Sequence, residues 1–239
     1  MIGLEFKKIK HSGLFPTFVI GGIFAALIPI LNMAVRSEIF INLEMPPVQI
    51  LLKENWQMMA MLNVLLITVG ACLLYNIEYA DNAIQKMNTL PIKEFQLYFS
   101  KATLITMLCV IVLLIEAAAI GFCTQHWFQL SQEMVLDIVK HFLYSLLLLL
   151  PVISIALLIA SACKNMWISL GIGVICVFTA SILPAKQFVF SLFPFALPFQ
   201  MYAGTAEDIL RNYMIAAVCE IAVFGIAEAL FLKIRRSLK

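Results

Sequence analysis

The chain of 239 residues is 63% hydrophobic and only 13% charged, with a formal net charge of +2 and a mean hydropathy of +0.99. Soluble domains contain roughly half apolar and a quarter charged residues, so this composition excludes an ordinary soluble domain. Several continuous apolar runs exceed about 18 residues, the length that marks a membrane-spanning helix. The sequence therefore predicts an all-α polytopic membrane protein and excludes the alternating strands of a membrane barrel.

The first stretch, residues 1–12, mixes apolar side chains with lysines. Its apolar positions are Ile2, Leu4, Phe6 and Ile9, and three lysines lie among them. This pattern is typical of a short amphipathic helix in the membrane interface, with a frayed basic tail as the alternative. The apolar run that follows is long and lacks the small residues of a signal-peptide cleavage site, so we expect it to remain as a helix.

Six apolar runs then predict six membrane-spanning helices. The predicted spans are residues 14–35, 55–76, 102–122, 138–162, 167–183 and 213–232. Pro29 is expected to kink the first span. Gly171 and Gly173 are expected to allow close packing of the fifth.

Polar or proline-broken segments connect these spans. They are residues 36–54, 77–101, 123–137, 163–166 and 184–212. In the first, Pro46 and Pro47 block a continuous helix. The last segment is apolar in its middle but is broken by Pro194 and Pro198, so we predict a re-entrant or interfacial cap outside the membrane, not a full span.

The distribution of lysine and arginine predicts the orientation in the membrane. With six spans, both termini lie on one side, together with the 77–101 loop. Eleven of the 16 basic residues fall on that side and five on the other. Because cytoplasmic loops carry the excess of Lys and Arg, we expect both termini and this loop to be cytoplasmic.

The 77–101 loop is the longest polar run between two apolar blocks. Residues 80–90 are expected to form a helix of about three turns, with acidic residues in or before its first turn, where the helix dipole favours them. Apolar residues recur at helical spacing, and Pro91 ends the helix. The residues that carry this pattern are Glu78, Asp81, Ile84, Met87, Leu90 and Pro91. A helix this short needs a partner, either the membrane surface or another protein; a plain interfacial connector is the alternative.

The motifs of common enzyme sites are missing. The sequence holds no GxxxxGK[ST], HExxH or GxSxG, so we expect neither catalysis nor ATP binding by this chain itself. The six cysteines form no CxxC pair and are expected to be buried small side chains. His11, His126 and His141 lack metal-ligand spacing, and the methionines of residues 57–62 are expected to pack; we predict no metal site.

Three glutamates fall within predicted spans: Glu116, Glu220 and Glu228. An ionisable group at bilayer depth costs a few kcal/mol, so it usually faces the bundle interior or water. One interpretation is a polar lining for a cationic or amphipathic substrate, or a proton relay, with Glu116 and Glu220 as the candidates. The other is a structural hydrogen bond to Ser, Thr or Tyr on a neighbouring helix. Glu228 lies about one turn from the cytoplasmic end, within reach of the interface.

The loop also carries a family resemblance. From Glu78 to Ile92 it reads E-x-x-x-x-x-I-x-x-M-x-x-L-P-I, and a basic residue, Lys101, precedes the third span. Together with the amphipathic N-terminus, the six spans and the proline-broken segment before the last span, this pattern resembles the membrane subunit of ABC-2 type transporters. It looks most like the small permeases of lantibiotic immunity and antimicrobial-peptide export in bacteria.

The resemblance implies a mechanical function in the bacterial plasma membrane. The 80–90 helix would couple to a separate ATP-binding subunit, present in two copies, which holds ATP and Mg. A second permease, identical or a sister subunit, would complete the exporter of hydrophobic or amphipathic peptides. One alternative hypothesis is an ion-coupled secondary transporter using Glu116 and Glu220, although the two halves show no inverted repeat. Another is a membrane protein that transports nothing, such as an assembly factor.

Overall fold

A computed structural model describes residues 13–79, 94–129, 131–182 and 188–237, and these residues form an all-helical fold. Five helices are long and apolar enough to cross a membrane. They are α2 (Leu14–Ile41), α3 (Pro47–Tyr79), α5 (Glu94–Phe128), α6 (Gln132–Ala162) and α9 (Glu207–Ser237). A sixth apolar helix, α7 (Met166–Ile182), has 17 residues and is shorter than these.

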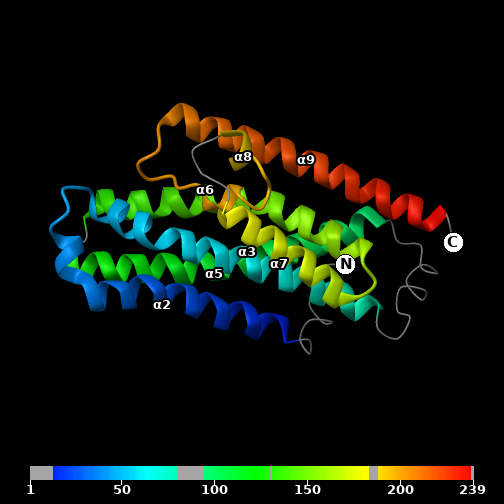
Figure 1. Ribbon diagram of the computed structural model, residues 1–239, viewed down its shortest axis with the longest axis horizontal. Helices are drawn as coiled ribbons and strands as arrows, with labels where there is room; N and C mark the ends of the chain where they lie inside the picture. Colours follow the sequence, from blue (N-terminus) through cyan, green and yellow to red (C-terminus); the bar gives the residue numbers. More distant parts are fainter. Residues whose placement is uncertain (1–12, 80–93, 130, 183–187, 238–239) are drawn as a thin grey trace.

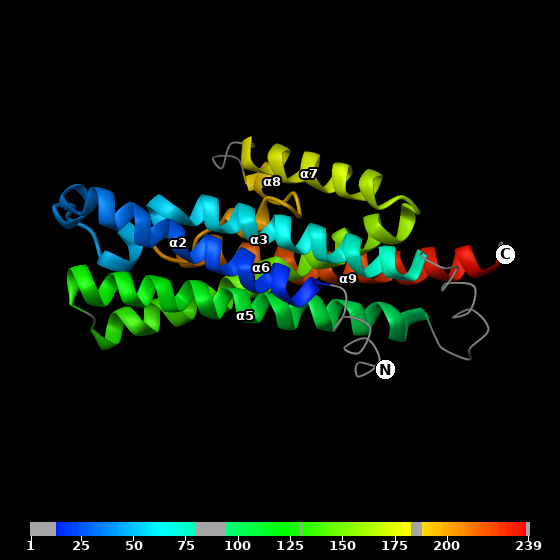
Figure 2. The same cartoon turned by 90° about the horizontal axis from the view of Figure 1, so that it is seen from below.

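The helices run side by side along one axis (Figures 1 and 2). The α2–α3 and α5–α6 connections lie at one end of the bundle, and the end of α3, the start of α5 and the end of α9 lie at the other. Helix α3 is central, because it packs against α2, α5, α6 and α7. Its most apolar window is 61% buried, whereas that of α9 is only 17% buried. Helix α9 therefore offers most of its surface to lipid or to another chain.

The helices continue beyond the predicted spans. The predicted 123–137 loop is wrong, because α5 runs to Phe128 and α6 begins at Gln132. Ser131 sets the start of α6, since its hydroxyl accepts a hydrogen bond from the Met134 backbone N–H at 3.3 Å, which is a typical N-cap. Hydropathy identifies the part of a helix that lies in the hydrocarbon core of the bilayer, whereas capping residues decide where the helix itself begins and ends.

Two connections agree with the sequence more closely. Pro47 is the first residue of α3, the position where a helix tolerates proline, but much of the predicted 36–54 segment is helical on either side of it. The predicted turn at 163–166 separates α6 from α7. There the side chain of Asn165 accepts a hydrogen bond from the Trp167 N–H at 2.9 Å and caps α7.

Two expectations about helix geometry can be compared with the structure. The non-helical backbone inside α2 falls at Arg36 (φ −129°, ψ 25°), and Pro29 lies within the helix, where the expected kink stays a prediction. Of the two glycines in α7, only Gly173 supports a close approach, since a Cβ there would lie 2.1 Å from Cγ2 of Thr68 on α3. A Cβ on Gly171 would meet nothing within 4 Å.

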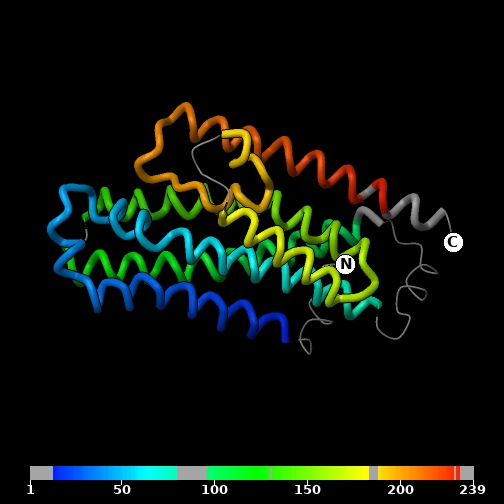
Figure 3. The backbone as a smooth tube through the Cα atoms, in the orientation of Figure 1, coloured from blue at the N-terminus to red at the C-terminus, as the bar shows by residue number. Residues whose placement is uncertain are grey.

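The segment before α9 folds back against the bundle (Figure 3). It contains a four-residue helix, α8 (Phe188–Ser191), and a 3-10 turn, η2 (Leu197–Phe199). The indole N–H of Trp56 on α3 donates to the Pro198 carbonyl at 3.0 Å, and the Tyr202 backbone N–H donates to Nδ1 of His141 on α6 at 3.3 Å. These buried hydrogen bonds fix the segment on α3 and α6. Helix α9 then begins at Glu207, earlier than the predicted start at 213.

Candidate functional site

Most residues of the predicted coupling helix lie outside the described part of the chain. Residues 80–93 are not described, and these include Asp81, Ile84, Met87, Leu90 and Pro91. Glu78 is described, on the last turns of α3. The structure therefore bears on how the loop is anchored, and the contacts of the helix itself stay a prediction.

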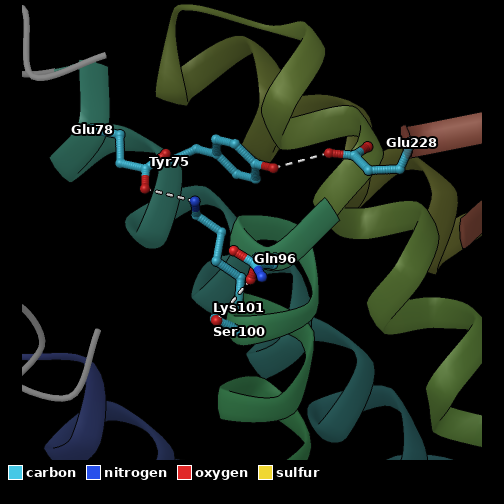
Figure 4. Close-up of polar contacts among 6 residues, drawn as sticks. All are labelled: Tyr75, Glu78, Gln96, Ser100, Lys101 and Glu228. Carbon is cyan, nitrogen blue, oxygen red and sulfur yellow. Dashed lines mark hydrogen bonds and ion pairs between the residues drawn. The ribbon is translucent and has the colours of Figure 1, made fainter. Parts of the chain in front are cut away.

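The two helices that flank the loop are joined by a buried ion pair. Nζ of Lys101, on α5, lies 2.6 Å from Oε1 of Glu78, on α3, and the side chains are only 2% and 6% exposed. The ammonium also lies 4.7 Å above the ring centroid of Tyr75 (Figure 4), which adds a cation–π attraction. Removing one partner of such a pair is strongly destabilising, because the other charge is left buried. The ion pair thus holds together the end of α3 and the start of α5, the two helices between which the loop runs.

A chain of hydrogen bonds extends this ion pair to two more helices. The Tyr75 hydroxyl donates to Oε1 of Glu228, on α9, at 2.9 Å (Figure 4). The Ser161 hydroxyl, on α6, lies 3.1 Å from Oε2 of the same carboxylate and shares its one proton between this oxygen and the Leu158 carbonyl at 2.8 Å. Glu228 is fully buried, so it does not reach outward to the interface. The structural interpretation, a hydrogen bond to Ser or Tyr on a neighbouring helix, is confirmed for this residue.

These five residues, Tyr75, Glu78, Lys101, Ser161 and Glu228, are named here the loop-base network. They come from α3, α5, α6 and α9, so static contacts connect both ends of the loop to α9 through Tyr75. The sequence placed Glu78 and Lys101 among the loop charges and missed their pairing. The available signal was the spacing of Tyr75 and Glu78, which puts both on one face of a helix.

Glu116 and Glu220 occupy different places. Glu116 is fully buried between α3 and α5, where Oε2 accepts a hydrogen bond from the Asn63 amide at 3.1 Å. Glu220 is half-buried on α9. One carboxylate oxygen of each, Oε1 of Glu116 and Oε2 of Glu220, has no hydrogen-bond partner among the described residues. Glu116 lies on α5 and Glu220 on α9, and no hydrogen bond between them is seen in the described part of the chain.

The described histidines and cysteines take part in packing. His126 stacks on Phe122 with ring centroids 5.8 Å apart, and His141 meets the edge of Trp56 at 4.4 Å. Within the described ranges no group of three His, Cys, Asp or Glu residues is close enough to hold a metal ion; His11 lies outside those ranges. All six cysteines are free, and Cys72, Cys109 and Cys123 are buried, whereas Cys219 is exposed.

The chain was compared with known protein families, curated proteins and solved structures. A family model described as "ABC-2 family transporter protein" matches residues 1–180 of the 239. The match includes the undescribed loop, the Glu78–Lys101 pair and Glu116, and it ends within α7. No curated protein and no solved structure matches the chain.

Proposed function

The chain belongs to the ABC-2 family of transporter proteins, and on that premise we propose that it is the permease subunit of an ATP-driven exporter of hydrophobic or amphipathic peptides. The family is a membrane component and implies a separate ATP-binding subunit. ATP and Mg therefore belong to the partner. The permease supplies a route and a mechanical link.

The proposed topology has six spans, with α7 as the fifth in chain order. A helix of 17 residues lies at the lower limit for spanning a bilayer. The segment between it and α9, which begins at Glu207, acts as a re-entrant outer cap. Both termini and the 77–101 loop face the cytoplasm of a bacterial plasma membrane. The eleven-to-five distribution of basic residues supports this orientation.

The loop-base network is the observation that carries the proposal. A helix at residues 80–90 docks on the ATP-binding subunit through Ile84, Met87 and Leu90, with Asp81 and Pro91 at its ends. Glu78 does not take part in this docking contact. Through Lys101 and Tyr75 it connects the end of α3 and the start of α5 to each other and to α9. Closure of two ATP-binding subunits thereby moves helices at the core of the permease.

The cellular role that we propose is immunity or resistance to antimicrobial peptides such as lantibiotics. The exporter contains two permeases, two copies of this chain or this chain and a sister subunit. Glu116 and Glu220 lie within apolar runs of the sequence, and each keeps one oxygen without a described partner; these two carboxylates support a route for cationic amphipathic molecules.

Co-purification with a co-expressed ABC ATP-binding subunit tests the proposal. The double variant I84D with M87D places two charges on the apolar face of the loop helix, so the ATP-binding subunit is expected to be lost from the purified complex. The matched control, Q85D with N88D, adds the same charges at polar positions and is expected to retain it. Equal recovery of the ATP-binding subunit with both variants would refute docking through this helix.

A further inference from the structure

Two buried polar side chains meet between the middle of α3 and α5. Asn63 on α3 is 3% exposed and Glu116 on α5 is 0% exposed. The Asn63 amide N–H donates to Oε2 of Glu116 at 3.1 Å. The other oxygen of each side chain, Oδ1 of Asn63 and Oε1 of Glu116, is buried and has no hydrogen-bond partner among the described residues. Both of these oxygens are acceptors as long as the glutamate is ionised, so the pair lacks a hydrogen-bond donor.

The packing around the pair leaves little space for a water molecule that could supply this donor. A cavity beside Asn63 has no room for a water. The other residues that line it are apolar: Phe18, Leu66, Cys109, Val112 and Leu149. Helix α2 lies directly against the same face of α5, since a Cβ added to Gly22 would be 3.3 Å from Cα of Val112, one turn before Glu116.

The described residues also offer no cation to an ionised Glu116. The basic side chains of α2, α3, α5 and α6 are Arg36, Lys53, Lys101, His126, Lys140 and His141. Those on α3 and α5 are ten to fifteen residues from the pair, about 15–22 Å along a helix. On the other two helices, Arg36 and Lys140 are exposed, and the ring of His141 packs on Trp56. A buried carboxylate without a cation is costly, and such a group takes up a proton instead.

We propose that Glu116 is a proton-binding site, in which Oε1 carries the proton and donates it in a hydrogen bond to Oδ1 of Asn63. Together with the amide hydrogen bond from Asn63 to Oε2, this makes a neutral acid–amide pair with one hydrogen bond in each direction. A single proton thereby gives both unpartnered oxygens a partner. The proposed export function is not needed for this inference, but a cationic substrate that reaches Glu116 has to take the place of the proton.

Infrared spectroscopy of the full chain in lipid nanodiscs tests the proton on Glu116. A protonated carboxyl has a C=O stretching band that is separate from the bands of carboxylates. The spectrum of the unmodified protein minus that of E116Q is expected to contain one such acid band, with the area of one carboxyl per chain. Glutamine offers an N–H in place of the O–H, so E116Q keeps both hydrogen bonds to Asn63. The control is E133Q, because Glu133 is exposed and its difference spectrum is expected to contain no acid band.

A second measurement tests the hydrogen bonds to Asn63. In N63V the carbonyl of the acid loses the amide donor, so the acid band of Glu116 is expected to shift to higher frequency. The matched control is N55V on the same helix. Asn55 is 2% exposed and is hydrogen-bonded to Asn32 and to the Leu51 carbonyl, so N55V is expected to leave the band in place. The comparison with E116Q requires neither asparagine variant to fold.

Two outcomes overturn the inference. A carboxylate band in place of the acid band, in the difference between the unmodified protein and E116Q, would show that Glu116 is ionised. An acid band that N63V leaves unshifted would show that Asn63 does not bond the acid, and the acid–amide pair would be wrong. Both outcomes would leave the co-purification result of the loop variants untouched, so a failure of this inference and a failure of the proposed function are distinguishable.

Discussion

Two groups of buried acidic residues differ in how completely they are bonded. In the loop-base network, Glu78 has an ammonium 2.6 Å away and Glu228 accepts hydrogen bonds on both oxygens. Glu116 and Glu220, named here the mid-membrane glutamates, each keep one oxygen without a described partner. A fully bonded buried group holds helices together, whereas an incompletely bonded one is able to exchange partners. The contrast agrees with a structural role for the first group, and the proposed contact with substrate falls to the second.

The largest effect is expected from K101M. The substitution leaves Glu78 buried without its cation, which costs about 3–5 kcal/mol, and the thermal unfolding temperature in detergent should fall accordingly. E78Q with K101M removes both charges and is expected to recover most of the loss. If K101M unfolds at the same temperature as the unmodified protein, the ion pair contributes nothing to the fold and the comparison fails.

Y75F tests the link to α9. It removes the donor to Oε1 of Glu228, which should cost about 1–3 kcal/mol because a buried acceptor loses its partner. The matched control is Y144F, since the hydroxyl of Tyr144 is buried without a hydrogen-bond partner in the described chain. The free energy of unfolding of both variants is measured by chemical denaturation. Equal decreases in Y75F and Y144F would show that the Tyr75–Glu228 hydrogen bond adds no stability beyond that of any buried tyrosine hydroxyl.

E116Q is expected to have a smaller effect, below about 1 kcal/mol, because one of the two carboxylate oxygens has no described partner to lose. Transport in reconstituted vesicles should change in rate but persist. Complete loss of transport in E116Q, with stability unchanged, would favour ion coupling through this residue over ATP-driven export.

The smallest change in stability is expected from E220Q, within about 0.5 kcal/mol, since Glu220 is half-buried and makes no described hydrogen bond through Oε2. Thermal unfolding measures it beside E116Q. A loss as large as that of K101M would place Glu220 among the structural residues.

The membrane class could be predicted from hydropathy, because side chains that face lipid must be apolar. Five of the six predicted spans lie in helices that are long and apolar enough to cross a membrane, and the sixth lies in the shorter α7. The ends of the helices could not. The 123–137 loop was predicted from polar residues such as His126, yet Ser131 capping and the continuing α5 leave only a short connection.

The candidate site was predictable only in part. Glu116, Glu220 and Glu228 were found because a charge within an apolar run is visible in the sequence. The pairing of Glu78 with Lys101 and the bond of Tyr75 to Glu228 join residues 23 and 153 positions apart. Contacts between residues so far apart in the sequence depend on how the helices pack against one another. The residue pattern within a single helix does not predict that packing.

The central claim is that the loop-base network transmits movement from the loop to α9, and ATP hydrolysis by the assembled complex tests it most directly. The rate is measured in nanodiscs relative to the free ATP-binding subunit, for Y75F and for the control Y144F. The account predicts that both variants retain the ATP-binding subunit. In the Y75F complex, the change in hydrolysis rate that the permease causes is expected to be about five times smaller than in the unmodified complex, which corresponds to a coupling free energy of about 1 kcal/mol. A Y75F complex that hydrolyses ATP like the Y144F complex would contradict it.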